Sequence, residues 1–178
     1  MNLVFGGDVI VRPLCSKDAE WIYHGMQDPE VSKWLLSAPY PYTREDADEF
    51  INKRLEGRGY GEFAYSIVRP RRDCSEGLGC ITLEADPSGS HELGYWLLRK
   101  EWGKGVAYQA LQDFVKGACK KHPDLKVFAN VEPENVRSIA LLKRLGMEYV
   151  KTHPFVSTTP GKRTGETIEL QRYQLSNN

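Results

Sequence analysis

A basic loop with two closely spaced glycines is the segment of this sequence whose residue types point most clearly to chemistry. Residues 99–108, Arg-Lys-Glu-Trp-Gly-Lys-Gly-Val-Ala-Tyr, lie between an apolar run at 93–98 and a segment of helical periodicity that begins at Ala107. Gly103 and Gly105 can adopt positive φ and expose backbone N–H groups, because neither carries a Cβ. The helix that follows adds its unpaired first-turn N–H groups and the positive end of its dipole. The loop therefore predicts a cradle for a phosphate or pyrophosphate; a strand-to-helix turn that merely uses glycine is the alternative.

The spacing of this loop differs from two widespread phosphate-binding patterns. A P-loop requires Gly-Lys-Ser/Thr after a fixed gap, and the sequence has none here. The dinucleotide-binding fingerprint requires a third glycine, and Tyr108 stands in its place. A nucleotide-binding regulatory domain that uses the same loop is therefore a disfavoured alternative.

A second strand–helix unit follows the first directly. Residues 125–131 are apolar and β-branched, which predicts a short strand, and the apolar periodicity of 136–145 predicts a helix. Asn135 is placed to cap the start of this helix, and Ser138 falls on its first turn. Gly146 is placed to end the helix in the left-handed conformation.

Together the two units resemble the GNAT superfamily of acetyl-CoA-dependent N-acetyltransferases. The sequence looks most like the RimJ/RimL branch, which acetylates the amino termini of ribosomal proteins. The resemblance is carried by ELGYWLLRKEWGKGVAYQAL at 92–111 and by NVEPENVRSIALLKRLGMEYV at 130–150. It extends more weakly to 9–23 and 28–51, so it covers nearly the whole chain.

One position of the phosphate loop departs from the superfamily pattern. That pattern reads Gln/Arg-x-x-Gly-x-Gly/Ala, and Trp102 here replaces the Gln/Arg, while Gly105 and Ala107 match. This departure is itself typical of the RimJ/RimL branch.

The order of the predicted elements agrees with the fold that the resemblance implies. Strands are expected at about 3–12, 61–69, 77–85, 91–98, 125–131, 147–156 and 165–175, and helices at about 17–26, 29–36, 43–56, 106–120 and 136–145. We expect a single GNAT-like α/β (α+β) domain over 1–178, with a mixed, mostly antiparallel sheet of six or seven strands and about four helices on both faces. The resemblance implies that the fourth and fifth strands splay apart. Thr43 and Asp46 predict a capping box at the third helix.

Composition and charge argue against several other classes of function. Lys and Arg together number 24, as do Asp and Glu, so the net charge is zero and no basic surface suggests nucleic acid as a partner. No apolar run approaches the ~20 residues of a membrane span, and no signal pattern is present, so no membrane partner is expected.

The four cysteines show no metal-ligand spacing; they are Cys15, Cys74, Cys80 and Cys119. This pattern predicts no metal site and reduced thiols in the cytoplasm. Monomer and homodimer both stay open.

The resemblance implies acetyl-CoA as the cosubstrate and places it at the first unit. The pyrophosphate would meet the backbone amides of 102–108, and the pantetheine arm would pair like an extra strand with 97–99. Asn130 and Asn135 match asparagines that line the gap between the splayed strands; for Asn135, helix capping is the competing role. The residues expected to bind acetyl-CoA are Leu97, Leu98, Arg99, Trp102, Gly103, Lys104, Gly105, Val106, Ala107, Tyr108, Asn130 and Asn135.

The resemblance also implies where protons would move. Glu92 matches a strand glutamate that lies near the amine in this family, so we expect it to act as the general base; a strand-edge charge in water is the alternative. His91 should point to the opposite face of the strand. Many members carry a proton-donating tyrosine where this sequence has Leu142. The RimJ/RimL branch offers Ser138 as the acid instead, and a serine at a helix start is the competing interpretation.

We therefore expect an N-acetyltransferase that moves the acetyl group of acetyl-CoA to a primary amine by direct attack in a ternary complex. At pH 7 an α-amine with a pKa of ~7.7 is about 15% neutral, whereas a lysine is under about 0.1% neutral. The acceptor is a protein N-terminus or a small-molecule amine, with Trp34, Tyr40 and Tyr42 as candidate walls of its pocket. A catalytically silent acyl-CoA-binding sensor or regulatory module is the alternative.

Overall fold

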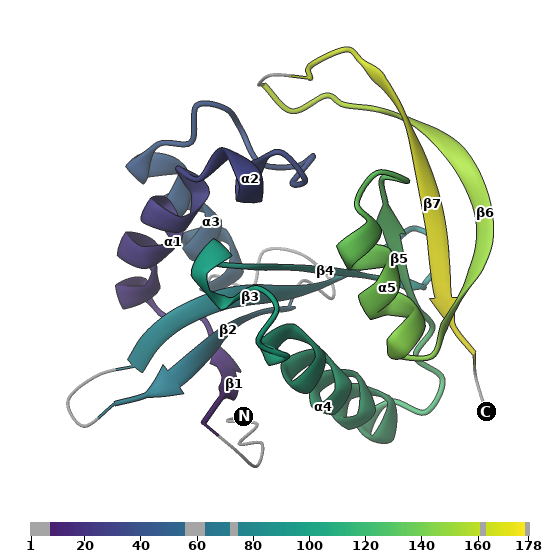
Figure 1. Ribbon diagram of the computed structural model, residues 1–178, viewed down its shortest axis with the longest axis horizontal. Helices are drawn as coiled ribbons and strands as arrows, with labels where there is room; N and C mark the ends of the chain where they lie inside the picture. The colour runs from purple at the N-terminus through teal and green to yellow at the C-terminus, as the bar shows by residue number, and fades with distance from the viewer. Residues whose placement is uncertain (1–7, 56–62, 72–74, 161–162, 177–178) are drawn as a thin grey trace.

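A seven-stranded mixed sheet in the order β1-β2-β3-β4-β5-β7-β6 forms the centre of the computed structural model (Figure 1), which describes residues 8–55, 63–71, 75–160 and 163–176. Its strands are β1 (Ile10–Pro13), β2 (Phe63–Pro70), β3 (Ser75–Ala85), β4 (His91–Leu97), β5 (Val127–Val131), β6 (Met147–Val156) and β7 (Thr167–Leu175). The helices are α1 (Ala19–Met26), α2 (Pro29–Ser32), α3 (Arg44–Leu55), α4 (Val106–Lys121) and α5 (Val136–Arg144), with 3₁₀ turns η1 (Ser16–Asp18) and η2 (Arg99–Glu101). None of the described helices has the length and apolar character needed to cross a membrane.

The parallel pair β4–β5 interrupts an otherwise antiparallel sheet. Only two residue pairs join these strands, His91 with Val127 and Glu92 with Phe128. Beyond Glu92 the strands diverge and leave a gap between them (Figure 1). The expected mixed sheet with splayed fourth and fifth strands is thus confirmed.

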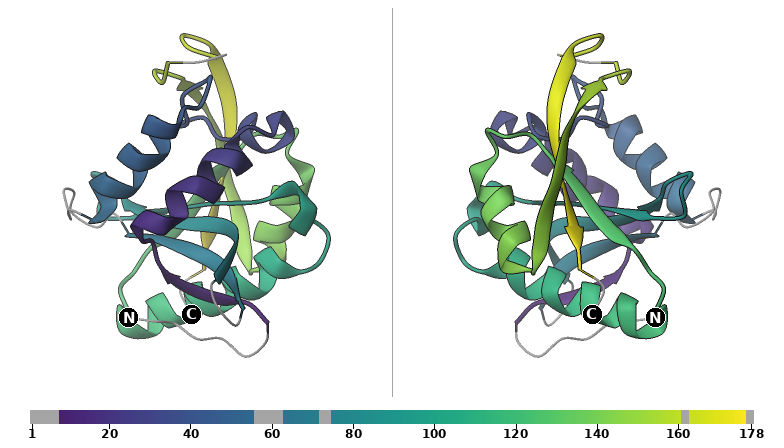
Figure 2. Two further views of the ribbon diagram at one scale, coloured as in Figure 1. Left: turned by 90° about the vertical axis from the view of Figure 1, so that its left-hand side faces the viewer. Right: turned by 90° about the vertical axis from the view of Figure 1, so that its right-hand side faces the viewer.

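Helices cover both faces of the sheet, with α1 and α3 on one face and α4 on the other (Figure 2). The α4 side holds the larger core, in which Leu111, Phe114 and Leu142 are almost fully buried. The α1/α3 side holds a second cluster around Ile22 and Ile51. Side chains of β4 alternate between the two: those of Leu93, Tyr95 and Leu97 join the α4 side, and that of Trp96 joins the α1/α3 side. The two faces of β4 therefore present different groups to the gap.

The element bounds mostly follow the predictions, with two exceptions near the N-terminus. The helix expected at 29–36 ends at Ser32, and the chain continues in i→i−3 turns, because the consecutive apolar residues 34–36 do not share one helical face. The strand expected at 3–12 is described only from residue 8, and it begins at Ile10. The capping box of α3 is confirmed, since the Thr43 N–H donates to Asp46 at 2.8 Å and the Asp46 N–H donates to Thr43 at 3.1 Å.

Asp18 ties the first helical turn to the sheet. Its buried carboxylate accepts hydrogen bonds from the Arg12 guanidinium and the Ser66 hydroxyl, each at 2.7 Å, and from the Trp21 indole and the Cys15 N–H, each at 2.9 Å. Burial alone would raise the pKa of Asp18, but these donors outweigh it and lower the pKa to about 2. The charged form of Asp18 therefore stabilises the fold.

Candidate active site

The loop between β4 and α4 has the open backbone that the glycine spacing predicts. Gly103 has φ of 75° and Gly105 has φ of 79°, and no atom lies within 4 Å of a Cβ built at either position. Gly105 caps α4 without a side-chain hydrogen bond, and the helical ladder begins with the Gln109 N–H donating to the Gly105 carbonyl. The N–H groups of 106–108 therefore have no helical acceptor and can face a phosphate.

The same loop is held in place by contacts with the sheet. The Trp102 indole N–H donates to the Leu97 carbonyl at 3.0 Å, and its ring packs against the α4-side core. Glu101, which is only 3% exposed, accepts from Arg69 at 3.1 Å and from Lys104 at 3.4 Å. Lys104 thus pairs with a carboxylate of its own loop, and Trp102 anchors the loop to the end of β4.

Along β4, the backbone N–H and C=O groups of every second residue point toward β5 and the gap. The His91 N–H donates to the Lys126 carbonyl at 2.7 Å, on the β5 side, so the backbone groups of Tyr95 and Leu97 point in the same direction. The Leu98 N–H donates instead to a carbonyl of β3 at 2.8 Å. An extended ligand in the gap would therefore find the backbone of Tyr95 and Leu97 beside it.

On the α4 side, a pair of hydroxyl groups crosses the gap. The Tyr95 hydroxyl of β4 lies 2.7 Å from Ser138 Oγ on the first turn of α5. Burial raises the pKa of Tyr95 to about 12, although the hydrogen bond with Ser138 lowers it in part. Asn135 caps α5 as predicted, because its side chain accepts from the Ser138 N–H at 3.2 Å. Ser138 is therefore fixed through both its main chain and its side chain.

On the α1/α3 side, Glu92 forms a polar network at the apex of the gap. Its carboxylate accepts from the Asn130 side chain of β5 at 3.0 Å. The Asn130 oxygen lies 3.0 Å from His153 Nε2 and accepts from Arg172 Nε at 3.2 Å. Burial raises the pKa of Glu92, while the hydrogen bond from Asn130 and the charge of Arg172 oppose that shift. Glu92 is thus a half-buried carboxylate whose pKa lies above the usual glutamate range.

His91 lies away from this network, as alternation along the strand predicts. It lines a cavity of about 480 Å³ on the α4 side, with Tyr65 and Phe114 among its walls. The cavity lies at the end of β4 remote from the phosphate loop, because β4 runs from His91 toward Gly103.

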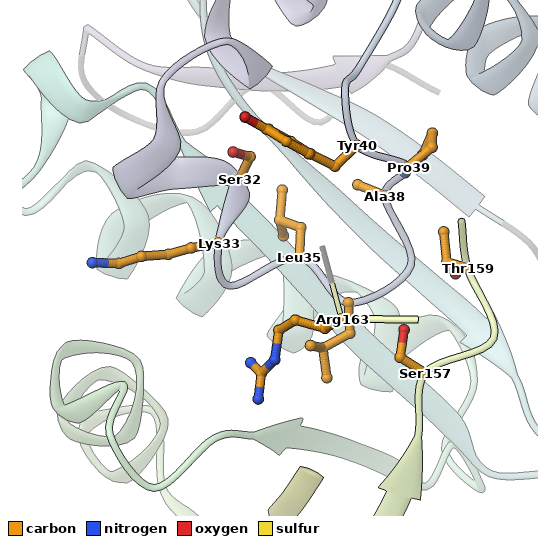
Figure 3. A pocket seen from close by; sticks show the side chains of 10 residues that line it. Ser32, Lys33, Leu35, Ala38, Pro39, Tyr40, Ser157, Thr159 and Arg163 are labelled. Carbon is orange, nitrogen blue, oxygen red and sulfur yellow. The ribbon is translucent and has the colours of Figure 1, made fainter. Parts of the chain in front are cut away.

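A small cavity lies between the segment after α2 and the chain joining β6 to β7 (Figure 3). It has a volume of about 110 Å³, and Leu35, Tyr40 and Arg163 are among its walls. Arg163 donates to Glu132 at 2.6 Å and so ties this edge of the cavity to the chain after β5. The Tyr40 N–H donates to the Pro160 carbonyl at 3.1 Å.

The three aromatic residues proposed as walls of the acceptor pocket differ in their exposure and in their surroundings. Tyr40 is 48% exposed and lines the cavity of Figure 3. Tyr42 is buried in the α1/α3-side cluster, where packing against Ile51 and its neighbours accounts for it. Trp34 is half-buried, with the Lys33 ammonium 5.1 Å from its ring.

Several polar residues of the site could not be found by following the sequence alone. Tyr95 lies within the apolar run at 93–98, and Arg172 and His153 reach Asn130 from strands that are distant in sequence. Alternation along β4 predicts that the side chains of Tyr95 and Glu92 lie on opposite faces of the sheet. It does not predict the contact between Tyr95 and Ser138. Arg99, which the sequence places among the acetyl-CoA-binding residues, has a largely exposed side chain whose Nη1 lies 3.9 Å from Asp28 Oδ1.

Two further properties bear on which chemistry the site can support. Within the described ranges, no three His, Cys, Asp or Glu side chains come together as a metal site would require. The described cysteines Cys15, Cys80 and Cys119 are free thiols.

Comparison with known proteins gives consistent matches. The family model of the acetyltransferase (GNAT) domain matches residues 8–148. An uncharacterized N-acetyltransferase, p20, of Bacillus licheniformis is 29% identical over 151 residues, which is 83% of each chain. A GNAT-family acetyltransferase from Bacillus anthracis superposes with a TM-score of 0.80 at 20% identity, over 99% of each chain.

Two other solved structures carry names that mention an acceptor. RimL, a ribosomal L7/L12 alpha-N-protein acetyltransferase in complex with coenzyme A, has a TM-score of 0.77 at 16% identity, over 98% of this chain and 97% of its own. A spermidine N-acetyltransferase from Vibrio cholerae, in complex with CoA and spermine, has a TM-score of 0.76 at 16% identity, over 96% of each chain. At these identities the two structures share the fold with this chain.

Proposed function

Because the chain belongs to the GNAT family of acetyltransferases, we propose that it acts as a single domain that transfers the acetyl group of acetyl-CoA to a primary amine. The observation that carries this proposal is the gap between β4 and β5, which has an open phosphate loop at one end and a different polar pair on each face. The amine attacks the thioester directly, with both substrates bound at once.

The phosphate loop supports the placement of acetyl-CoA. Positive φ at Gly103 and Gly105 leaves open space beside three helix N–H groups without helical acceptors, which suits a pyrophosphate. The pantetheine arm would then lie along the β4 edge of the gap, beside the backbone of Tyr95 and Leu97. Trp102 and Glu101 hold the loop in the conformation that this binding requires.

Glu92 and Ser138 are the proposed proton acceptor and donor. They lie on opposite faces of the sheet, on either side of the gap where the thioester would sit. Glu92 takes a proton from the attacking amine, and its raised pKa brings it closer to that of the amine. Ser138 gives a proton to the departing sulfur. Each residue acts at one end of a single transfer.

The acceptor is proposed to approach from the α1/α3 side. Glu92 lies on this side of the sheet, because it shares a face of β4 with Trp96. The cavity of Figure 3, lined by the segment after α2, is the proposed entry for the acceptor. The site presents one carboxylate as a base, so an amine that is partly neutral at pH 7 is the better substrate. An α-amino group at a protein N-terminus is favoured on this ground, and a low-pKa small-molecule amine is the second candidate. Two proteins of the same fold are named for a ribosomal protein and for spermidine.

An acceptor screen with labelled acetyl-CoA tests the proposal. The panel contains peptides with different N-terminal residues, the same peptides with blocked α-amines, polyamines and free amino acids. We expect labelled product and stoichiometric thiol release with at least one free amine. Tight binding of acetyl-CoA with no product from any amine would instead support the silent acyl-CoA-binding module.

A further inference from the structure

The structure assigns a role to the hydroxyl of Tyr95, which reaches from β4 across the gap to α5. We propose that Tyr95 positions Ser138 and resupplies its proton, so that the proton given to the departing sulfur comes from the Tyr95–Ser138 pair. This inference rests on the proposed acetyl transfer and goes beyond it by adding a residue that acts through Ser138.

The place of the pair in the fold supports this role. Tyr95 lies three residues beyond Glu92, where β4 and β5 no longer pair, and Ser138 lies on the helix that follows β5. The hydrogen bond between their hydroxyls therefore spans the α4-side opening of the gap. A thioester between the strands would have this pair on one side and Glu92 on the other.

The hydrogen-bond geometry provides a direct proton path between the two hydroxyls. The Tyr95 oxygen is 2.7 Å from Ser138 Oγ and 3.5 Å from the Ser138 carbonyl oxygen. Only the first distance is normal for an O–H···O bond, and either hydroxyl can donate in it. The proposed relay uses the arrangement in which the phenol donates to Oγ. The proton of Ser138 Oγ is then free to point into the gap, toward the position of the sulfur.

The chemistry of the two hydroxyls favours a relay over donation by the serine alone. An aliphatic hydroxyl holds its proton about as strongly as water, whose pKa is about 15.7. The pKa of the buried Tyr95 phenol is raised only to about 12, so the phenol is the stronger acid and still carries its proton at neutral pH. A serine backed by this phenol loses its proton more readily than a serine in water.

The proposed step balances as follows. The amine nitrogen bonds to the acetyl carbonyl carbon, and the carbon–sulfur bond breaks with its electron pair going to sulfur. Sulfur takes the proton of Ser138 Oγ, and Oγ takes the proton of the Tyr95 hydroxyl. Glu92 takes the proton that the amine loses, and exchange with solvent returns a proton to Tyr95.

A double-mutant cycle with a matched control tests the proposal. Tyr95→Phe removes the hydroxyl and keeps the ring. Tyr65→Phe makes the same change on β2, which is separated from β4 by β3, at a ring that packs against the same core. We expect Tyr95→Phe and Ser138→Ala each to lower kcat at least tenfold, with the KM for acetyl-CoA within twofold. The double variant should be no slower than Ser138→Ala, and Tyr65→Phe should retain the wild-type kcat.

Three results would overturn the inference. One is a Tyr95→Phe enzyme within threefold of wild-type kcat while Ser138→Ala is impaired. Another is a double variant whose loss is the product of the two single losses, since Tyr95 would then act independently of Ser138. The third is a loss of kcat in Tyr95→Phe that the Tyr65→Phe control shares. Absence of transfer by the wild-type enzyme would refute the proposed function itself, which separates the two failures.

A fluorinated tyrosine at position 95 provides a second measurement that does not depend on the folding of the phenylalanine variant. Fluorination makes the phenol more acidic and keeps its hydrogen bond with Ser138. The alkaline limit of kcat should therefore move to lower pH in the fluorinated enzyme. An alkaline limit at the same pH as in the wild type would contradict the relay.

Discussion

Replacement of Gly105 by valine separates the role of the phosphate loop in binding from its role in folding. Gly105 has φ of 79°, a conformation that a β-branched residue adopts only with strain, on the order of 1–3 kcal/mol. No protein atom lies within 4 Å of the added Cβ, so the variant should fold with that loss of stability and no core disruption. The branched side chain would stand where the pyrophosphate approaches the N–H groups of α4.

Gly89 is the matched control for this substitution. It has φ of 82°, also has no atom within 4 Å of an added Cβ, and lies in the turn at the opposite end of β4. A seven-residue strand at about 3.3 Å per residue separates the two sites by roughly 20 Å. Gly89→Val should therefore have a similar cost in stability and leave CoA affinity unchanged.

Calorimetric titration with CoA and urea unfolding of both variants make the comparison. We expect Gly105→Val to weaken CoA binding at least tenfold, which is about 1.4 kcal/mol, while Gly89→Val binds as the wild type does. Equal CoA affinity of folded Gly105→Val and wild type would refute the placement of the pyrophosphate on this loop.

Three further predictions follow from other contacts. Asn135→Ala should lower the free energy of unfolding by roughly 1 kcal/mol through the lost helix cap and also weaken CoA binding; unchanged CoA affinity would leave only the cap. Glu92→Gln should lower kcat by ~10²–10⁴-fold and abolish the acidic limb of kcat/KM, or move it to the pKa of the acceptor amine; burial raises the pKa of Glu92, so the wild-type limb should lie above the usual glutamate range. An acidic limb that stays at its wild-type pH in Glu92→Gln would assign the base elsewhere. Asp18, whose pKa is about 2 in the folded protein and ordinarily 3.8, should contribute about 2 kcal/mol of stability that is present above pH 3.8 and lost as the pH falls toward 2. Urea unfolding of Asp18→Asn at a series of pH values should lack this loss.

Local features of the chain could be predicted because their causes are local. The positive φ of Gly105 follows from a glycine between a strand and a helix, and the cap by Asn135 follows from its place three residues before Ser138. The order of strands and helices likewise reflects apolar periodicity within short windows. These predictions needed no knowledge of which strands pair.

Contacts between distant segments could not be predicted in the same way. Arg172 reaches Asn130 because β7 inserts between β5 and β6, an order that periodicity does not specify. Lys104 pairs with Glu101, which is buried beside a strand from the first half of the chain. Tyr42 has an aromatic side chain suited to a pocket wall, but the packing of α1 against α3 buries it. Composition alone does not distinguish these outcomes.

The most direct test of acetyl transfer to an amine is the mass of a peptide substrate after incubation with acetyl-CoA and the enzyme. The peptide is supplied in two forms, one with a free α-amine and one with that amine blocked and a lysine retained. We predict that the free form gains one acetyl group on its α-amine, with one thiol released for each, and that the blocked form gains none. Thiol release without acetylated peptide, or acetylation of the lysine in the blocked form at an equal rate, would contradict this account.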